Sequence, residues 1–300
     1  MPILSIQNVT KRYQNHLAVD DVSFDMPHGT ILGLLGPNGA GKTSLIRIIT
    51  TITQADSGQV LFDGEPLSSY HPGQIGYLPE ERGLYKKMKV GEHLIYLAML
   101  KGLSLTEAKS RIDHWMQRFE MTDWWEKKVN ELSKGMQQKV QFVSTIVHDP
   151  KLIILDEPFS GLDPLNTKLM KEEIALLQQK GMSVIFSTHR MEQVEEVCKE
   201  IVLINKGKNI LTGSVAEVKE TYKDNIFKIN YAGELPESVR QLEQVQDING
   251  QSLTFRSDSI HDANHFMKNL MNQDMMITGF AEILPTLNEI FIKQVTTTHE

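Results

Sequence analysis

The segment Gly36-Pro37-Asn38-Gly39-Ala40-Gly41-Lys42-Thr43-Ser44 decides how the rest of this chain is interpreted. It follows the apolar run Ile31 to Leu35 and precedes the apolar positions of Leu45 to Ile49, so it joins a predicted buried strand to a predicted helix. Its glycines let successive backbone N–H groups converge on an anion, and the helix N-terminus adds positive potential. The pattern G-x-x-x-x-G-K-[ST] in this context predicts a phosphate-binding loop, in which Lys42 reaches the β- and γ-phosphates and Thr43 binds Mg²⁺. The alternative, a glycine-rich turn that binds nothing, stays open at this point.

Length and cysteine content indicate a reduced protein with one large or two moderate domains. The chain has 300 residues and one cysteine, Cys198, which therefore has no internal disulfide partner. Cys198 lies in a helical pattern with Val194 and Val197, so we expect a small core residue of a cytosolic protein. The N-terminus lacks a signal-peptide pattern, and no apolar run approaches the ~20 residues of a membrane span. Any role at a membrane is then expected to depend on a partner.

The formal net charge of −7 argues against a general nucleic-acid binder, for which a basic face is expected. We therefore expect no nucleic-acid partner. The same charge does not argue against a nucleotide site, because exposed charges are screened beyond about 8 Å at physiological salt. Lys42 and Mg²⁺ would act on phosphates in direct contact.

The first eighty residues show short alternating strands at 3–9 and 18–26, with Tyr13 in a loop between them. Tyr13 has two readings: an aromatic ring that stacks on a purine base, or a loop residue that packs on the strand beneath. A further strand is expected at 58–64, between two glycine turns. Another, from Ile75, is expected to stop at Pro79 and to place Glu80 at its end.

Residues from about 84 to 150 have a different character, with helical spacing and no strand pattern between 90 and 150. We expect a helical insertion there, in which the adjacent Trp124 and Trp125 serve packing. The insertion closes on residues 131–140, a polar turn with Gly135 that opens another helix.

Two near-continuous apolar strands follow, at 151–156 and 183–188, separated by a helix from about 164 to 180. Parallel strands covered on both faces have this pattern and carry their chemistry at their carboxyl ends. Asp156, Glu157 and His189 are thereby expected at the same edge as the phosphate loop. Transfer of a phosphoryl group to water needs a held γ-phosphate, a metal and an oriented water. Asp156 would hold Mg²⁺, Glu157 would accept a proton from the water, and His189 would bond the γ-phosphate.

The remainder, residues 223–300, follows a βαββαβ order. Strands are expected around 227–231, 244–248, 252–256 and 275–281, with Asn249-Gly250 as a hairpin turn and helices at 235–243, 260–272 and from 286. This order predicts a small ferredoxin-like α+β domain after the domain at 1–222. It carries no recognisable chemistry.

Over about residues 1 to 220 the chain resembles the ATP-binding subunits of ABC transporters. The segment Gly36 to Ser44 matches the family's Walker A loop, and Leu132-Ser133-Lys134-Gly135-Met136 matches its signature. Asp156 and Glu157 match the Walker B aspartate and the catalytic glutamate, and Tyr13 matches the aromatic residue that stacks on adenine. His189 matches the switch histidine, and Ser160 to Asp163 match the D-loop, so the resemblance implies a nucleotide-contacting role for Asp163.

The resemblance implies a P-loop NTPase fold, ATP and Mg²⁺ as cofactors, and a head-to-tail pair that sandwiches two ATP molecules. Ser133 and Gly135 would then complete the partner's site. Three positions depart from the family pattern: the signature contains Lys134 and Met136, and Glu80 stands where the family has glutamine. Glu80 could still reach Mg²⁺ or the attacking water. The stretch Gly76 to Leu84 and the C-terminal Pro285 to Phe291 are similar to bacterial subunits of sodium and drug exporters.

We therefore expect an ATPase that powers an ABC exporter, peripheral on the cytoplasmic face of the membrane through an integral-membrane permease. The two ATP-binding subunits could be identical or a pseudo-dimer. In the resembling family a helix of the permease docks near residues 81–88, where the apolar Leu84, Tyr85 and Met88 stand among cations and are expected to be exposed. Two alternatives stay open: a soluble ABC ATPase acting on DNA or ribosomes, and a regulatory subunit without turnover.

Overall fold

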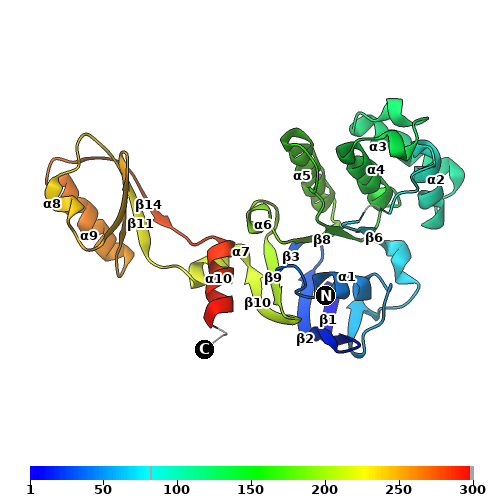
Figure 1. Ribbon diagram of the computed structural model, residues 1–300, viewed down its shortest axis with the longest axis horizontal. Helices are drawn as coiled ribbons and strands as arrows, with labels where there is room; N and C mark the ends of the chain where they lie inside the picture. Colours follow the sequence, from blue (N-terminus) through cyan, green and yellow to red (C-terminus); the bar gives the residue numbers. More distant parts are fainter. Residues whose placement is uncertain (82, 298–300) are drawn as a thin grey trace. The chain divides into compact units, whose positions relative to one another are not determined.

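The chain divides into two compact units, Met1–Ser214 and Val215–Glu300. The computed structural model describes residues 1–81 and 83–297, and Figure 1 traces them by element. Within those residues, no helix is both long and apolar enough to cross a membrane. The division lies earlier than the 222/223 boundary expected from the sequence, because the helix α7 (Val215–Thr221) belongs to the second unit.

A six-stranded sheet forms the centre of the first unit, in the order β10-β9-β3-β8-β7-β6. All neighbouring strands are parallel except β10, which pairs antiparallel with β9. The strands are β3 (Ile31–Leu35), β6 (Ile75–Leu78), β7 (Leu152–Asp156), β8 (Ser183–Thr188), β9 (Glu200–Asn205) and β10 (Lys208–Ser214). Every residue of β3, β7 and β8 is buried, as expected for parallel strands covered on both faces.

A second, antiparallel sheet has the order β2-β1-β4-β5. Its strands are β1 (Pro2–Tyr13), β2 (His16–Pro27), β4 (Ser57–Phe62) and β5 (Glu65–Pro66). The helix α1 (Lys42–Ile49) joins one apolar cluster with both sheets, through buried residues such as Leu45 and Ile49. The start of α1, and with it the phosphate loop, is thus fixed by the core of the unit.

The helical insertion is present between β6 and β7, as the sequence predicts. It comprises α2 (Val90–Leu100), α3 (Leu105–Arg118) and α4 (Lys134–Ile146), with the short 3₁₀ turns η2 (Thr122–Trp124) and η3 (Val129–Glu131). A further 3₁₀ turn, η1 (His71–Gln74), precedes β6. Trp125 packs on α2 so closely that a Cβ at Gly91 would collide with its ring, which confirms the packing role expected for that tryptophan. Figure 1 shows α2, α3 and α4 gathered at one end of the first unit.

Two helices complete the first unit: α5 (Pro164–Gln179), which was predicted, and the short α6 (Met191–Val197). Cys198 follows α6 and is buried against Gly33 of β3, so it is a core residue as expected, and burial raises the pKa of its thiol. β9 and β10, which were not predicted from the sequence, form a hairpin across the turn at Lys206-Gly207.

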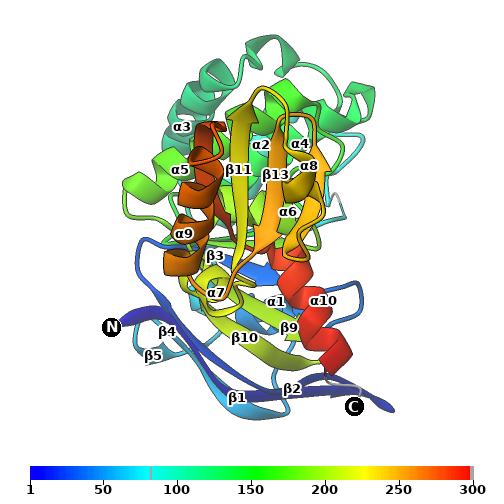
Figure 2. The same cartoon turned by 90° about the vertical axis from the view of Figure 1, so that its left-hand side faces the viewer.

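The second unit has the predicted ferredoxin-like topology, an antiparallel sheet in the order β12-β13-β11-β14. Both helices between its strands cover the same face of the sheet (Figure 2). After α7, its elements are β11 (Ile226–Ala232), α8 (Glu237–Arg240), β12 (Val245–Asn249), β13 (Ser252–Arg256), α9 (Ile260–Met271), β14 (Met276–Ile283) and α10 (Leu287–Thr297). Its apolar cluster is its own, with Phe227 and Phe255 at the centre.

Two sequence expectations in the first unit need correction. Tyr13 does not lie in a loop; it is the last residue of β1, which is longer than the predicted strand and turns directly into β2. Leu84, taken from its polar surroundings to be exposed, is buried, whereas the neighbouring Tyr85 is 50% exposed. A mixed run of charged and apolar residues does not tell which of its members point inward.

Candidate functional site

The phosphate loop connects the end of β3 to the start of α1 with glycines where other residues would not fit. Gly36 and Gly41 have φ angles of 147° and 112°. A Cβ at Gly36 would collide with the carbonyl oxygen of Ile204, and one at Gly41 with that of Ala18. Gly39 has φ 78° and faces open space. The loop therefore takes a conformation that suits convergence of its N–H groups.

Lys42 lies at the first position of α1 with its side chain turned back under the loop. Its Nζ donates to the carbonyl oxygens of Gly36 at 2.6 Å and Pro37 at 3.2 Å. Lys42 is 8% exposed, and burial lowers the pKa of its ammonium, although three nearby carboxylates oppose that shift. A buried cation on the inner side of the loop suits a phosphate anion.

A cavity of about 330 Å³ opens in front of the loop. Residues 38–44 form one side of it, and the rest is lined by Tyr13, His16, Ala18, Glu80, Asp156 and Glu157. The structure thus brings together nearly all predicted contacts of the nucleotide with its own chain. Gly36 and Pro37 lie behind them as the carbonyl partners of Lys42, and His189 lies beside Glu157.

Asp156 ends β7 and is held by the neighbouring strand. Its Oδ1 accepts a hydrogen bond from Ser187 Oγ at 2.8 Å. Burial raises the pKa of the Asp156 carboxyl, and nearby Glu80 and Glu157 add to the shift, while Ser187 and Lys42 oppose it. Several carboxylates around one ammonium leave an excess of negative charge, which fits a divalent cation.

Glu157 and His189, which were predicted to act as two separate groups, form one hydrogen-bonded unit. Glu157 Oε1 accepts from the backbone N–H of His189 at 2.9 Å and lies 2.6 Å from His189 Nδ1. Its other oxygen accepts from Thr188 Oγ1 at 3.0 Å. Because a carboxylate can only accept, Nδ1 carries a proton in this pair. Nε2 takes no part in the hydrogen bond with Glu157. Glu157 also has a positive φ of 50°, the kind of strained backbone found at functional sites.

The remaining predicted residues line a different cavity, of about 390 Å³. Ser133, Gly135 and Asp163 belong to it, together with Lys134 and Met136 of the signature. Ser133 caps α4, its Oγ accepting from the N–H of Met136 at 3.2 Å, and Asp163 caps α5 through the N–H of Asn166 at 2.9 Å. The two cavities share no lining residue. A single chain therefore does not bring Ser133, Gly135 or Asp163 to the phosphate loop.

Sequence reasoning missed several residues of the site: His16, which lines the first cavity, and Ser187 and Thr188, which hold the two acidic residues. A signal for the latter two existed, since they are the polar carboxyl end of a strand predicted to lie beside the Asp156 strand. His16 has no such signal, because its place depends on the turn between β1 and β2.

The residues present fit Mg²⁺ and a nucleotide. Mg²⁺ prefers hard oxygen ligands and takes only one or two from protein, the others coming from water and phosphate. Thr43 and Asp156 provide such oxygens on the same cavity. No cluster of three or more His, Cys, Asp or Glu residues suited to a metal occurs in the part of the chain that the structure describes.

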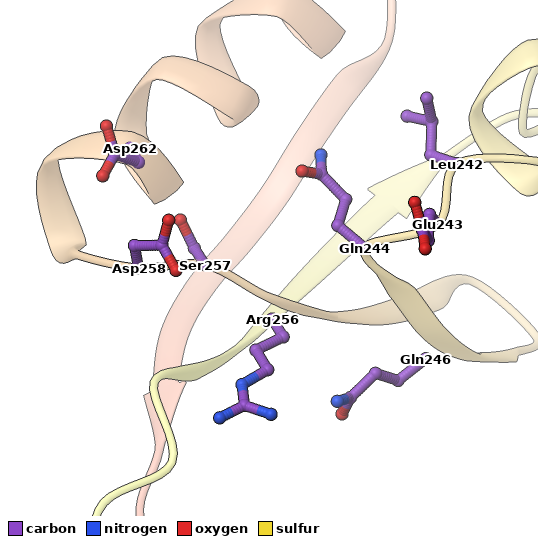
Figure 3. Close-up of a pocket in the computed structure, with 8 residues that line it drawn as sticks. All are labelled: Leu242, Glu243, Gln244, Gln246, Arg256, Ser257, Asp258 and Asp262. Atoms are coloured by element: carbon purple, nitrogen blue, oxygen red, sulfur yellow. The ribbon is translucent and has the colours of Figure 1, made fainter.

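A larger hollow of about 630 Å³ lies in the second unit, between the segment 242–246 and the start of α9. Arg256, Glu243, Asp258 and Asp262 line it, and Figure 3 shows their polar ends pointing in different directions. It has neither a glycine loop nor converging acids. The first cavity is therefore the candidate catalytic site.

Comparisons with known proteins agree with this geometry. Residues 19–160 match the family model described as "ABC transporter", and residues 213–295 match "ATP-binding protein DrrA1-3-like, C-terminal domain". The chain is 41% identical to the ABC transporter ATP-binding protein YhaQ of Bacillus subtilis, over 99% of this chain and all of that protein. It is 34% identical to the Nod factor export ATP-binding protein I of Burkholderia thailandensis, over 70% of each chain.

A solved ATP-binding subunit of an ABC transporter superposes with a TM-score of 0.69 at 30% identity, covering 73% of this chain and 93% of that one. The chain belongs to the family of ABC transporter ATP-binding proteins. It is an ATP-binding subunit with the ABC ATPase fold, and subunits of this family work with membrane permeases.

Proposed function

We propose that this chain hydrolyses ATP as one half of a head-to-tail dimer that powers export through a membrane permease. The observation that carries the proposal is the separation of the family's motifs into two cavities of one chain. The phosphate loop and acids line the first, and the signature lines the second. Two copies related by a twofold axis would place each signature opposite the other copy's phosphate loop, since an isologous interface repeats its contacts.

The chemistry assigned to each residue follows from its position. The loop N–H groups and Lys42 hold the β- and γ-phosphates, and Tyr13, 39% exposed at the rim, is available to stack on adenine. Glu157 accepts the proton of the attacking water. Mg²⁺ on Thr43 and Asp156 would neutralise charge on the phosphate oxygens, with Glu80 as a further ligand or as a contact of the water.

His189 and Glu157 divide their work through the bond between them. While His189 Nδ1–H donates to Glu157, the carboxylate is held in place, and its Oε1 accepts from both the ring and the backbone N–H of His189. If the imidazole swings to bond the γ-phosphate, Oε1 keeps only the backbone N–H of His189 and can accept a hydrogen bond from the attacking water. Arrival of the γ-phosphate would thereby prepare the base.

The permease contact is placed on the exposed aromatic surface of the helical insertion. Tyr85 and Tyr96 are 50% and 43% exposed, and their rings meet edge to face with centroids 5.7 Å apart. We place the protein on the cytoplasmic face of the membrane through this contact. Export is favoured over import by the similarity to a Nod factor export protein; the permease would select the substrate.

Purified protein tests the proposal. It should hydrolyse ATP in the presence of Mg²⁺, and the Glu157→Gln variant should form an ATP-dependent dimer in light-scattering measurements. Copurification with a permease from membranes tests the membrane role. A protein that binds ATP but stays monomeric in the Glu157→Gln form would overturn the dimer.

A further inference from the structure

Two glutamines of α4 reach into the two loops that carry the catalytic carboxylates. Gln138 Nε2 donates to the carbonyl oxygen of Pro158 at 2.9 Å, and Gln141 Nε2 donates to that of Pro79 at 3.0 Å. Both glutamines are only 3% exposed. Pro158 directly follows Glu157, and Pro79 directly precedes Glu80. Side chains three positions apart lie on one face of a helix, so a single face of α4 contacts both loops.

The C-terminal half of α4 is fixed to the central sheet. A Cβ at Gly76 of β6 would collide with the backbone oxygen of Thr145, so only glycine permits this approach of helix to strand. Thr145 Oγ1 also lies 3.4 Å from the carbonyl oxygen of Tyr77 and 2.9 Å from that of Gln141. The contacts with α4 therefore follow β6 from Gly76 to Pro79, the residue before Glu80.

The other end of α4 carries the signature. Ser133 caps the helix and lines the second cavity together with Gly135. At a rise of 1.5 Å per residue, Ser133 lies only about 8 Å along the helix from Gln138 and about 12 Å from Gln141. Over such short distances a hydrogen-bonded helix moves as one body, so a shift at either loop is passed to the signature.

One atom of this arrangement is left without a partner. Gln141 Oε1 is buried and accepts no hydrogen bond from any residue that the structure describes. Burying an amide oxygen unpaired is costly, which an apolar side chain would avoid. The amide of Gln141 therefore contributes its donor to Pro79, and its oxygen keeps the capacity to accept a further hydrogen bond.

We infer that Gln138 and Gln141 are positioning residues that couple the two ATP sites of the dimer. In each chain they tie the loops of Glu157 and Glu80, which act on the chain's own nucleotide, to Ser133 and Gly135, which act on the partner's. The inference rests on the proposed head-to-tail pair. It adds that occupancy of one site sets the position of the signature offered to the other.

The test removes the two amide donors and keeps side-chain length. The double variant Gln138→Met, Gln141→Met is compared with the wild-type full chain in ATPase rate as a function of ATP concentration. The Hill coefficient, which cannot exceed the number of sites, should fall from between 1 and 2 to about 1. ATP binding to the monomer should change by no more than about twofold, because the donors do not touch the phosphate loop.

Gln178→Met is the matched control. Gln178 lies on α5, and its Nε2 likewise donates to a backbone carbonyl oxygen, that of Gly29 at 2.5 Å, but neither residue lines the first or the second cavity. The variant loses a comparable bond elsewhere, so its Hill coefficient should stay at the wild-type value. If the double variant does not fold, as judged by its thermal unfolding curve, the single variants Gln138→Met and Gln141→Met each remove one donor without placing a charge in the buried position.

Failure of the coupling role and failure of the head-to-tail dimer give different results. A wild type that forms ATP-dependent dimers and hydrolyses cooperatively, with the same Hill coefficient in the double variant, overturns the inference and leaves the dimer standing. Equal loss of cooperativity in Gln178→Met also overturns it, because the effect would then follow from the loss of any such amide bond. A wild type without an ATP-dependent dimer overturns the head-to-tail pair, and this inference with it.

Discussion

At the scale of single residues, the hydrogen bonds of Glu157 decide how it can act. Three donors hold its carboxylate: the Thr188 hydroxyl on one oxygen, and the backbone and ring N–H of His189 on the other. Two of these donors occupy Oε1, so this oxygen can accept a hydrogen bond from the attacking water only when one of them leaves. The backbone and Thr188 bonds are fixed by β8 and its end, and the imidazole, 47% exposed, is the one that can move.

We expect Glu157→Gln to retain ATP binding while hydrolysis falls by ~10² or more, the usual contribution of a general base. The amide keeps the size of the side chain but has little basicity. Single-turnover hydrolysis and equilibrium binding of labelled ATP measure the two effects. Lys42→Ala is the contrasting variant, expected to lose binding itself. Wild-type turnover in Glu157→Gln would remove this residue from the mechanism.

Asp156 is expected to lower stability in the absence of ligand. Burial and neighbouring carboxylates raise its pKa above the usual 3.8. For an acid whose pKa is raised by folding, the favourable contribution exists at low pH and is lost as the pH rises through the folded-state pKa. At neutral pH the ionised Asp156 therefore opposes folding until a cation neutralises it.

The variant Asp156→Asn should accordingly unfold at a higher temperature than the wild type at pH 7.5 without nucleotide or metal. The difference should shrink as the pH is lowered through the raised pKa of Asp156. The same variant should lose the additional stabilisation that Mg²⁺ with ATP gives the wild type. Thermal unfolding across pH and ligand series measures all three effects, and a lower melting temperature at pH 7.5 would contradict the argument.

At the scale of elements, the helical insertion carries both the signature and the exposed aromatic surface. Tyr85 contacts Tyr96 of α2 and also His93, with ring centroids 5.7 Å apart in both pairs. His93 is fully buried, and burial lowers its pKa to about 4. The exposed aromatic rings therefore pack on a neutral, buried imidazole. Two supported rings at the surface suit an interface, where a buried aromatic residue can contribute about 2 kcal/mol.

Tyr85→Asp should leave the ATPase rate of the purified subunit nearly unchanged but release it from the permease. A charge buried against an apolar partner is costly, whereas in the free subunit the side chain remains in water. Copurification from membranes and transport measure the effect. Tyr70→Asp is the control, because Tyr70 is 81% exposed and lies outside the insertion. Full membrane binding by Tyr85→Asp would place the docking surface elsewhere.

The sequence predicts elements better than it predicts contacts between them. The strand of Asp156 and that of Ser183 to Thr188 were predicted because both run apolar to a polar end, and their parallel pairing follows from that pattern. The Glu157–His189 bond could not be predicted, because it depends on the register of β7 against β8 and on the positive φ of Glu157. The glutamines of α4 were missed for the same reason: nothing in a helical pattern tells which loop carbonyl a buried amide meets.

At the scale of the whole molecule, each of the two units has its own apolar core. The cluster around α1 contains only residues of the first unit, and the cluster around Phe227 and Phe255 only residues of the second. The first unit contains both nucleotide-related cavities. Nucleotide binding is therefore expected to need the first unit alone, and the second is left for assembly or regulation.

The edge strand β14 of the second unit favours a role in assembly over one in regulation. β14 is an edge strand of eight residues, Met276 to Ile283, with one charged side chain, Glu282. Long edges with few charges present unpaired backbone groups to other strands, and proteins usually protect them. We expect a second copy to pair there.

Truncation after Ser214 should keep ATP binding and weaken dimerisation, as measured by light scattering of the Glu157→Gln form with ATP. Ala281→Lys, which adds a charge to the edge at an exposed position, should weaken the dimer without loss of either core. Ser252→Lys, on β13 inside the sheet, is the matched charge control. An unchanged dimer in both the truncated chain and Ala281→Lys would show that the second unit serves regulation rather than assembly.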